Sequence, residues 1–263
     1  MGSFDHNPII EMRNIEKHFG PVIALNGVSF DVRPGECHCL LGDNGAGKST
    51  FIKTMAGVHK PTKGEILFEG RQMSFDSPRD AMEAGIATVY QDLAMIPLMS
   101  VTRNFWMGRE PVKRFGPLMF MDFKTANEVT MSEMRKMGIN LRSPDQAVGT
   151  LSGGERQTVA IARAVHFGAK VLILDEPTSA LGVRQTANVL STIDKVRKTG
   201  IGIVFITHNV RHALAVGDRF TVLNRGKTLG TAQRGQITPE ELQDLMAGGQ
   251  EMVALEGSLG GTV

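Results

Sequence analysis

Nine consecutive residues form the clearest candidate for chemistry in this chain. They are Gly42, Asp43, Asn44, Gly45, Ala46, Gly47, Lys48, Ser49 and Thr50, of which the first eight fit the pattern G-x-x-x-x-G-K-[S/T]. Glycines let successive backbone N–H groups curl around phosphate oxygens, and the positive end of a following helix adds to the attraction. In this pattern the lysine reaches the outer phosphates of a nucleotide and the serine ligates Mg²⁺. A glycine-rich turn before an ordinary helix is the alternative, but a chance match is on the order of 1%.

Two adjacent acids follow an apolar run. Residues 171–174 are Val-Leu-Ile-Leu, and Asp175 and Glu176 come next. In open parallel sheets, ligands bind at the carboxyl ends of the strands. Asp175 suits the coordination shell of Mg²⁺, and Glu176 can reach an attacking water as a general base. Taken alone, an acid that caps the next helix explains the pair equally well. Together with the phosphate loop, the pair predicts nucleotide hydrolysis.

A second helix start with anion-binding character lies at residues 151–157, Leu-Ser-Gly-Gly-Glu-Arg-Gln. Ser152 and Glu155 have the spacing of a capping box that opens an amphipathic helix. Gly153 and Gly154 allow close backbone approach, so the same helix start can bind an anion. Since the first loop already surrounds its nucleotide on one side, we expect this second helix start to serve ATP held by another subunit.

The composition is ordinary for a folded domain. Of the 263 residues, 41% are hydrophobic and 21% are charged, and the formal net charge is +2. This balance gives no whole-chain signal for a nucleic-acid partner. The amino-terminal residues lack the basic start and apolar stretch of a signal peptide, so we expect no export. The longest apolar runs are far below the roughly 20 residues of a membrane helix, so membrane association is expected through partners.

Cys37 and Cys39 are the only cysteines. They lie two residues apart in a predicted strand, where side chains share a face but are poorly placed for a disulfide. This favours a reducing compartment. A metal-binding pair is the alternative, but no second cluster of Cys or His lies nearby in the sequence. His38 is expected to face the other way.

The elements that position these residues alternate between helices and strands. Beyond residue 152, helices are predicted at 155–167, 183–198 and 210–216, and apolar strands at 171–175, 201–207 and 220–224. This order predicts a parallel sheet covered on both faces. A strand at 37–41 and a helix from Lys48 to Gly57 flank the phosphate loop. Residues 9–30 indicate a small antiparallel sheet with turns at Gly20-Pro21 and at Asn26-Gly27, the latter a hairpin signal.

The middle of the chain differs from both ends. Residues 93–150 are rich in methionine and are predicted to form an inserted lobe, mostly helical, with a helix at 123–137. Before it, Ser77 as N-cap with Pro78 and Asp80 predicts a helix that runs to Gly85. A last helix is expected to begin at Thr238, and residues 247–263 are expected to be loose.

The three motifs together resemble the ABC transporter ATP-binding family over nearly the whole chain, because residues 151–157 match the family signature. The resemblance implies an α/β fold: a RecA-like P-loop NTPase core at about 8–90 and 155–240, with an antiparallel β subdomain and an inserted α-helical lobe at about 91–154. The nucleotide-binding domain would span residues 8–250, followed by a flexible tail at 251–263.

The resemblance also implies roles for single residues. Gln91 would meet Mg²⁺ and the attacking water, and His208 would contact the γ-phosphate. The Mg²⁺ that accompanies ATP would be held by Ser49, Gln91 and Asp175. The signature would bind the nucleotide of the other subunit through Ser152, Gly153, Gly154 and Glu155. Phe19 matches the position that stacks on adenine, and a core aromatic is the alternative. Gly182 departs from the family, which usually has Asp there, and glycine cannot reproduce a carboxylate contact across the dimer.

Residues 77–85, 90–93 and 108–111 are similar to bacterial importers of monosaccharides, with fructose, ribose or mannose as the expected cargo. That class usually fuses two cassettes in one chain, whereas this chain has one. Two copies of this chain are therefore expected to form an ATP-bound homodimer. The resemblance implies membrane permease subunits, a periplasmic sugar-binding protein, and a place on the cytoplasmic face of the inner membrane. An ABC ATPase for another solute is the main alternative. An ABC ATPase of DNA repair is disfavoured, because no sustained heptads appear between Gln91 and Leu151. A translation factor of the same superfamily is also disfavoured, because it would carry two cassettes and a linker in one chain.

Overall fold

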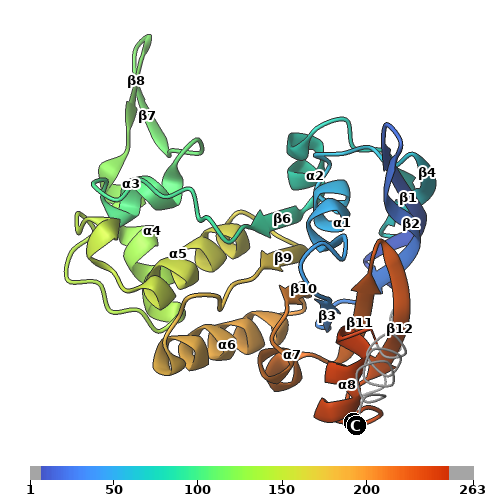
Figure 1. Ribbon diagram of the computed structural model, residues 1–263. Helices are drawn as coiled ribbons and strands as arrows, with labels where there is room; N and C mark the ends of the chain where they lie inside the picture. Colours follow the sequence, from blue (N-terminus) through green and yellow to red (C-terminus); the bar gives the residue numbers. More distant parts are fainter. Residues whose placement is uncertain (1–6, 249–263) are drawn as a thin grey trace, which may run out of the picture.

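A six-stranded sheet forms the centre of the molecule in the computed structural model, which describes residues 7–248 (Figure 1). Its strand order is β12-β11-β3-β10-β9-β6, and only β12 runs antiparallel to its neighbour. The strands are β3 (Cys37–Leu41), β6 (Ile86–Val89), β9 (Val171–Asp175), β10 (Gly202–Thr207), β11 (Arg219–Asn224) and β12 (Lys227–Gln233). The predicted parallel sheet is therefore confirmed, and β12 extends it beyond the predicted strands.

Both faces of this sheet are buried. One face packs on α1 (Lys48–Met55) and on the antiparallel sheet, through side chains such as Leu40 and Val204. The other face, with Cys39 and Phe205, is covered by four helices. These are α5 (Gly153–His166), α6 (Val183–Arg197), α7 (Val210–Val216) and α8 (Pro239–Met246). Alternate residues of one strand thus reach different cores, which explains why the strands are apolar throughout.

The antiparallel subdomain has the order β2-β1-β4-β5. Its strands are β1 (Ile10–Phe19), β2 (Val22–Val32), β4 (Lys63–Phe68) and β5 (Arg71–Met73). The predicted turn at Gly20-Pro21 is confirmed, but the hairpin at Asn26-Gly27 is wrong, because β2 continues through these residues. Gly27 has φ +72° beside an irregular step in the β1–β2 pairing, as in a β-bulge. The Asn26 N–H instead donates to the carbonyl of Gly226, a tertiary contact.

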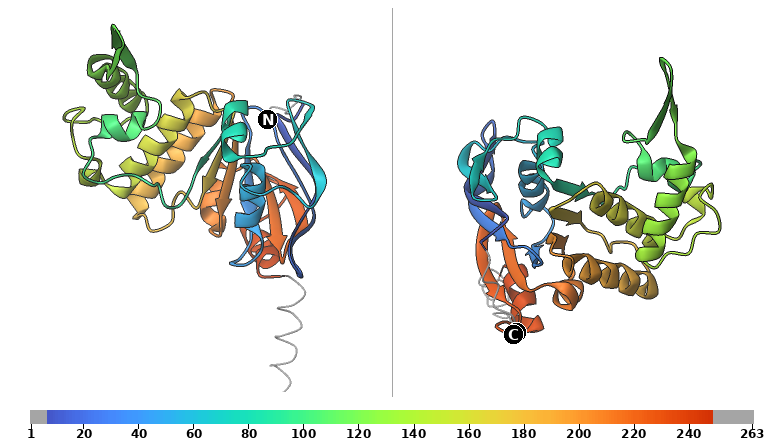
Figure 2. Two further views of the ribbon diagram at one scale, coloured as in Figure 1. Left: turned by 90° about the horizontal axis from the view of Figure 1, so that it is seen from above. Right: turned by 180° about the vertical axis from the view of Figure 1, so that it is seen from behind.

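The inserted lobe lies on the side of the core away from the antiparallel sheet (Figures 1 and 2). It contains α3 (Val101–Trp106), α4 (Phe123–Lys136), η1 (Val148–Thr150) and a hairpin of β7 (Val112–Phe115) and β8 (Leu118–Met121). The prediction of a mostly helical lobe missed this hairpin. Helix α5 joins lobe and core, since its Val159 packs in the lobe cluster and its Ile161 in the core. Helix α2 (Pro78–Ala84) has the predicted Ser77 cap and ends at Gly85.

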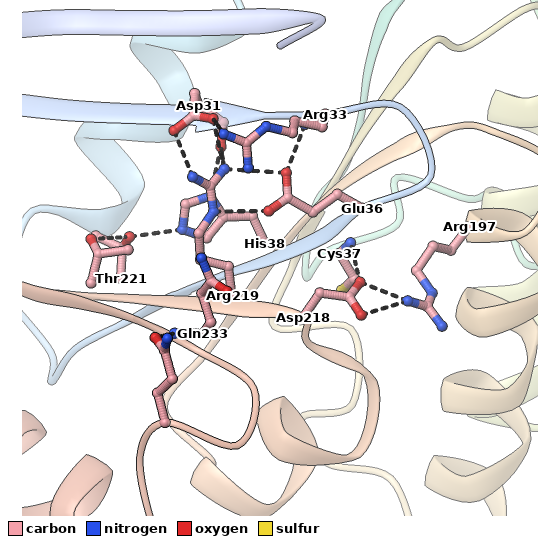
Figure 3. Close-up of polar contacts among 12 residues, drawn as sticks. Asp31, Arg33, Glu36, Cys37, His38, Arg197, Asp218, Arg219, Thr221 and Gln233 are labelled. Atoms are coloured by element: carbon pink, nitrogen blue, oxygen red, sulfur yellow. Dashed lines mark hydrogen bonds and ion pairs between the residues drawn. The ribbon is translucent and has the colours of Figure 1, made fainter. Parts of the chain in front are cut away.

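A buried polar network ties the antiparallel subdomain to the parallel sheet (Figure 3). His38 faces away from the buried, free thiols of Cys37 and Cys39, as expected, and stacks on Phe30 at 3.9 Å between ring centroids. Its Nδ1 lies 2.6 Å from the Asp31 carbonyl oxygen and its Nε2 lies 2.7 Å from a threonine hydroxyl of β11. Complete burial lowers the pKa of His38 well below its usual value, so the ring is neutral.

Within residues 7–248, no helix has the length and apolar character that crossing a membrane requires. The loose tail predicted at 251–263 lies outside the described residues, as do 249 and 250.

Candidate active site

The phosphate loop connects the end of β3 to the first turn of α1, as predicted. Residues 43–50 line a cavity of about 440 Å³, together with Val22, Ile23, Ala24, Arg225 and Gly226. Gly42 has φ +147°, and a Cβ atom at this position would lie 2.4 Å from the carbonyl oxygen of Leu223. Only glycine fits this conformation and this close approach. The loop therefore owes its shape to the glycines of the pattern.

Lys48 is held inside its own loop. Its Nζ donates to the carbonyl oxygens of Gly42 at 2.6 Å and of Asp43 at 3.1 Å. Burial lowers the pKa of Lys48, while the nearby carboxylates of Glu176, Asp43 and Asp175 act in the opposite direction. The ammonium is thus positioned beside the backbone N–H groups of the loop, where phosphate oxygens are expected to bind.

Asp175 is the last residue of β9, and its environment suits a cation. Burial raises the pKa of Asp175 first, and the adjacent carboxylate of Glu176 raises it further, while Lys48 and Lys53 lower it. A cation at this position would relieve the repulsion between the two carboxylates. Within the described residues there is no cluster of three or more His, Cys, Asp or Glu side chains suited to a metal. The oxygen donors Ser49 and Asp175 instead fit Mg²⁺, which keeps waters and phosphate oxygens as ligands.

Glu176 and His208 are brought together from two neighbouring strands. His208 Nδ1 lies 2.8 Å from Glu176 Oε1, and Thr207 Oγ1 donates to Glu176 Oε2 at 3.4 Å. Glu176 has φ +48°, an uncommon conformation for a residue with a side chain. Its N–H donates to the carbonyl oxygen of Ile206, which fixes the backbone at the end of β10. The structure thus places Glu176, the candidate general base, in contact with His208, the residue that is expected to contact the γ-phosphate.

Gln91 lies in the segment that follows β6 at the same edge of the sheet. It lies two residues beyond the end of β6, and Val89 of β6 pairs with Leu174, directly before Asp175. The side chain is exposed. Because parallel strands end at a common edge, the chain positions of Gln91 and Asp175 follow neighbouring strand ends. The role of Gln91 in binding Mg²⁺ and water stays a prediction.

The signature residues form the predicted capping box but do not line the cavity at the phosphate loop. Ser152 Oγ accepts the Glu155 N–H at 3.3 Å, and Glu155 Oε2 accepts the Ser152 N–H at 2.7 Å. A Cβ atom at Gly153 would lie 2.7 Å from Leu181 Cδ2. The signature therefore packs against Leu181, the residue before Gly182, and Gly182 is the N-cap of α6 and provides no side-chain cap.

Phe19 ends β1 and is 43% exposed, so the alternative of a core aromatic is wrong. Lys17 Nζ lies 5.1 Å from the ring centroid, and the His59 ring meets it edge-on at 5.2 Å. Phe19 is not among the residues that line the cavity, and its stacking on adenine stays a prediction. Arg225 and Gly226, which do line it, were missed, because no local pattern connects the β11–β12 turn to the phosphate loop.

A second cavity, of about 330 Å³, lies between lobe and core. It is lined by Tyr90 and Asp92, which flank Gln91, and by side chains of α2, α5 and the lobe. On the lobe side, Arg163 donates to the Met107 carbonyl oxygen at 2.8 Å, and Arg109 lies over the Phe167 ring. This cavity contains no candidate catalytic residue, but it adjoins the segment that carries Gln91.

Sequence and structure comparisons find proteins that are similar to most of this chain. The model of the ABC transporter family matches residues 25–179. A xylose/arabinose import ATP-binding protein of Sulfolobus acidocaldarius is 42% identical over 238 residues, which cover 90% of this chain and 93% of the relative. A fructose import ATP-binding protein of Rhizobium meliloti is 41% identical over 250 residues, covering 93% and 95%. A crystal structure of an ABC transporter cassette in its ADP conformation superposes with a TM-score of 0.80, at 24% identity, covering 96% of this chain and all of that one.

Proposed function

This chain belongs to the ABC transporter ATP-binding family, and from that premise we propose that it binds and hydrolyses ATP to drive uptake of a monosaccharide. The observation that carries the chemistry is the contact between Glu176 and His208, at 2.8 Å, where β9 and β10 end beside the phosphate loop. The sugar class rests on the relatives, which are import proteins for xylose or arabinose and for fructose.

The proposed hydrolysis assigns one task to each side chain. Lys48 and the loop N–H groups bind the β- and γ-phosphates and offset their charge. Glu176 accepts a proton from the attacking water, and His208 orients Glu176 and contacts the γ-phosphate. Ser49, Gln91 and Asp175 would hold Mg²⁺, which neutralises charge on the phosphates when bound. Phe19 would stack on adenine at the end of β1.

A second copy of the chain would complete the site. Ser152, Gly153, Gly154 and Glu155 form an anion-binding helix start, yet none of them lines the cavity of their own phosphate loop. We therefore propose an ATP-bound homodimer in which the signature of one subunit meets the nucleotide of the other. We also propose the division into a core at about 8–90 and 155–240 and a lobe at about 91–154, within a domain spanning 8–250.

Membrane permease subunits would transmit this cycle, and a periplasmic sugar-binding protein would deliver the cargo to them. The cavity between lobe and core suits a permease segment, because it adjoins Gln91 and spans the two parts that would move relative to each other. We therefore propose that the protein lies on the cytoplasmic face of the inner membrane, held there by its partners. The sugar itself would not touch this chain.

The test of the proposed chemistry is Glu176→Gln, compared with Glu128→Gln on the exposed side of α4 as a matched control. We expect Glu176→Gln to retain binding of labelled ATP but to release phosphate at least about a hundredfold more slowly, the scale of a lost general base. The control is expected to match the wild type. Near-normal turnover of purified Glu176→Gln would remove Glu176 from this role. Uptake of labelled fructose, ribose and xylose after reconstitution with the permease would then separate sugar import from transport of another solute.

A further inference from the structure

The β7–β8 hairpin is the part of the lobe that no step of ATP hydrolysis uses. In Figure 1 and the right-hand view of Figure 2 it projects away from α3 and α4. Its side chains are strongly exposed although most are apolar: Phe115 is 70% exposed, Met119 63%, Leu118 59% and Phe120 54%. Isolated exposed apolar residues are normal, but a contiguous group of this kind marks an interaction site.

The strand register distributes apolar and basic side chains over both faces. Arg114 pairs with Met119 on one face, while Lys113 pairs with Phe120 and Phe115 pairs with Leu118 on the other. The apex, from residue 115 to 118, contains no charge at all. The two cations lie one and two residues behind it. At roughly 3.3 Å per residue, they lie about 3–7 Å from the apolar tip.

The charges near the hairpin leave a positive excess. Between residues 109 and 124 there are four cations and two acids. Both acids are engaged locally: Glu110 accepts the Gly108 N–H at 3.0 Å, and Asp122 caps α4 and forms an ion pair with Lys113 at 2.9 Å. Arg114 forms no ion pair with any described residue.

The base of the hairpin is braced, so its position relative to the lobe is defined. The Asp122 N–H donates to the Pro111 carbonyl oxygen at 2.7 Å and closes the two strands. Met121 is half-buried and packs against the apolar cluster of the lobe. The tip itself has no such support, and a two-stranded hairpin alone is only marginally stable in water.

We propose that the β7–β8 hairpin inserts its apolar apex into the surface of an anionic lipid bilayer, with Arg114 at the level of the lipid phosphates and Lys113 held behind it by Asp122. Interfacial segments bury apolar groups about 5–10 Å deep, which matches the spacing between tip and cations. Basic residues at an anionic membrane add attraction that salt screens. Apolar and basic side chains occur on both faces of the hairpin, which suits a bilayer because lipid surrounds an inserted tip on all sides.

The test uses the full chain without nucleotide, so its outcome is independent of the proposed ATP hydrolysis. Sedimentation with vesicles of equimolar phosphatidylcholine and phosphatidylglycerol is expected to capture the wild type, and vesicles of phosphatidylcholine alone to capture much less. Charge reversal in Arg114→Glu is expected to weaken binding about 30-fold, from about 1 kcal/mol of lost attraction and a similar repulsion. Phe115→Ser/Leu118→Ser is expected to abolish it. The matched controls Lys227→Glu and Leu229→Ser, on exposed β12, are expected to bind as the wild type does.

A fluorescent probe at the tip gives a second, direct measurement. Phe120→Trp is expected to show a blue shift with anionic vesicles, against the buried background of Trp106. Failure of the wild type to bind anionic vesicles, or equal binding by Arg114→Glu, would overturn the proposal. Loss of permease assembly in the hairpin variants without any vesicle binding would also overturn it and would assign the surface to a protein partner.

Discussion

Replacing Arg219 with methionine tests the contribution of the polar network that joins the antiparallel subdomain to the core. Arg219 lies at the start of β11, and its guanidinium donates to the two carboxylate oxygens of Asp31 at 2.9 and 2.7 Å. It also donates to Glu36 Oε2 at 3.2 Å. Glu36 is 1% exposed, and in Arg219→Met its carboxylate would keep only the Arg33 N–H, at 2.7 Å, as a partner.

The expected loss of stability follows from this orphaned charge. Breaking a buried ion pair by removing one partner costs about 3–5 kcal/mol. Because Asp31 is partly exposed and regains water, the lower end, about 3 kcal/mol, applies here. At about 2–4 °C per kcal/mol for a chain of this size, Tm is expected to fall by about 6–12 °C. Arg219→Met/Glu36→Gln removes the orphaned charge and is expected to recover part of this loss.

The pH dependence provides a signature that simple loss of packing would not show. Burial raises the pKa of Glu36, and Arg219 is the largest opposing influence, so Arg219→Met raises this pKa further. A carboxyl group with a raised folded pKa binds more protons in the folded state, so stability falls as pH rises above about 4.3, the unfolded value, through the folded pKa. The Tm deficit of Arg219→Met is therefore expected to shrink as pH is lowered toward that value.

Thermal unfolding followed by circular dichroism measures both effects. Arg71→Met, on exposed β5, is the matched control and is expected to leave Tm unchanged. A deficit of less than about 2 °C, which corresponds to under 1 kcal/mol, would refute the assigned cost. A deficit that grows as pH falls would refute the role given to Glu36.

Three further predictions concern the nucleotide site. Lys48→Ala is expected to weaken binding of labelled ATP about 10–100-fold, because charge-assisted hydrogen bonds contribute about 1.5–3 kcal/mol; unchanged affinity would contradict the phosphate-loop assignment. Mixing Lys48→Ala with Ser152→Arg chains is expected to restore part of the ATPase activity that each lacks, since each mixed dimer keeps one intact composite site, and full activity of Ser152→Arg alone at monomeric dilution would exclude that site. Gly182→Asp is expected to raise stability by a few tenths of a kcal/mol through N-capping of α6, and to make ATPase activity more cooperative if the carboxylate restores coupling; a lower Tm would contradict the capping argument.

The sequence predicts what is encoded locally. The phosphate loop, the Ser152–Glu155 capping box and the Ser77 cap each need only a few neighbouring residues, and all three form as expected. Glu176 was predicted from its place after an apolar strand, and His208 from the family resemblance. The two residues meet because neighbouring parallel strands end at one edge of the sheet. Their hydrogen bond, however, depends on the left-handed backbone of Glu176, which no local pattern indicates.

The failures have tertiary causes. Asn26-Gly27 has the composition of a hairpin turn, but pairing with β1 and the hydrogen bond from Asn26 to Gly226 keep these residues inside β2. The β7–β8 hairpin was missed because its apolar residues are exposed, so hydrophobic periodicity carries no information about it. Arg219 lies 188 residues from Asp31 and 183 residues from Glu36, and their pairing depends on the alignment of β2, β3 and β11.

The supports of the phosphate loop explain why a short pattern can still predict a site built from distant segments. Gly42 lies against the Leu223 carbonyl, and the Gly226 N–H donates to the Ala46 carbonyl at 2.9 Å. Gly226 in turn accepts the Asn26 N–H at 2.8 Å, so β2 and the β11–β12 turn brace the loop through backbone groups. Backbone contacts place few demands on side-chain identity, so the pattern needs only the glycines that admit them and the lysine that binds phosphate. Because these hydrogen bonds connect β2 to the loop, a movement of the antiparallel subdomain would be transmitted directly to the phosphate loop.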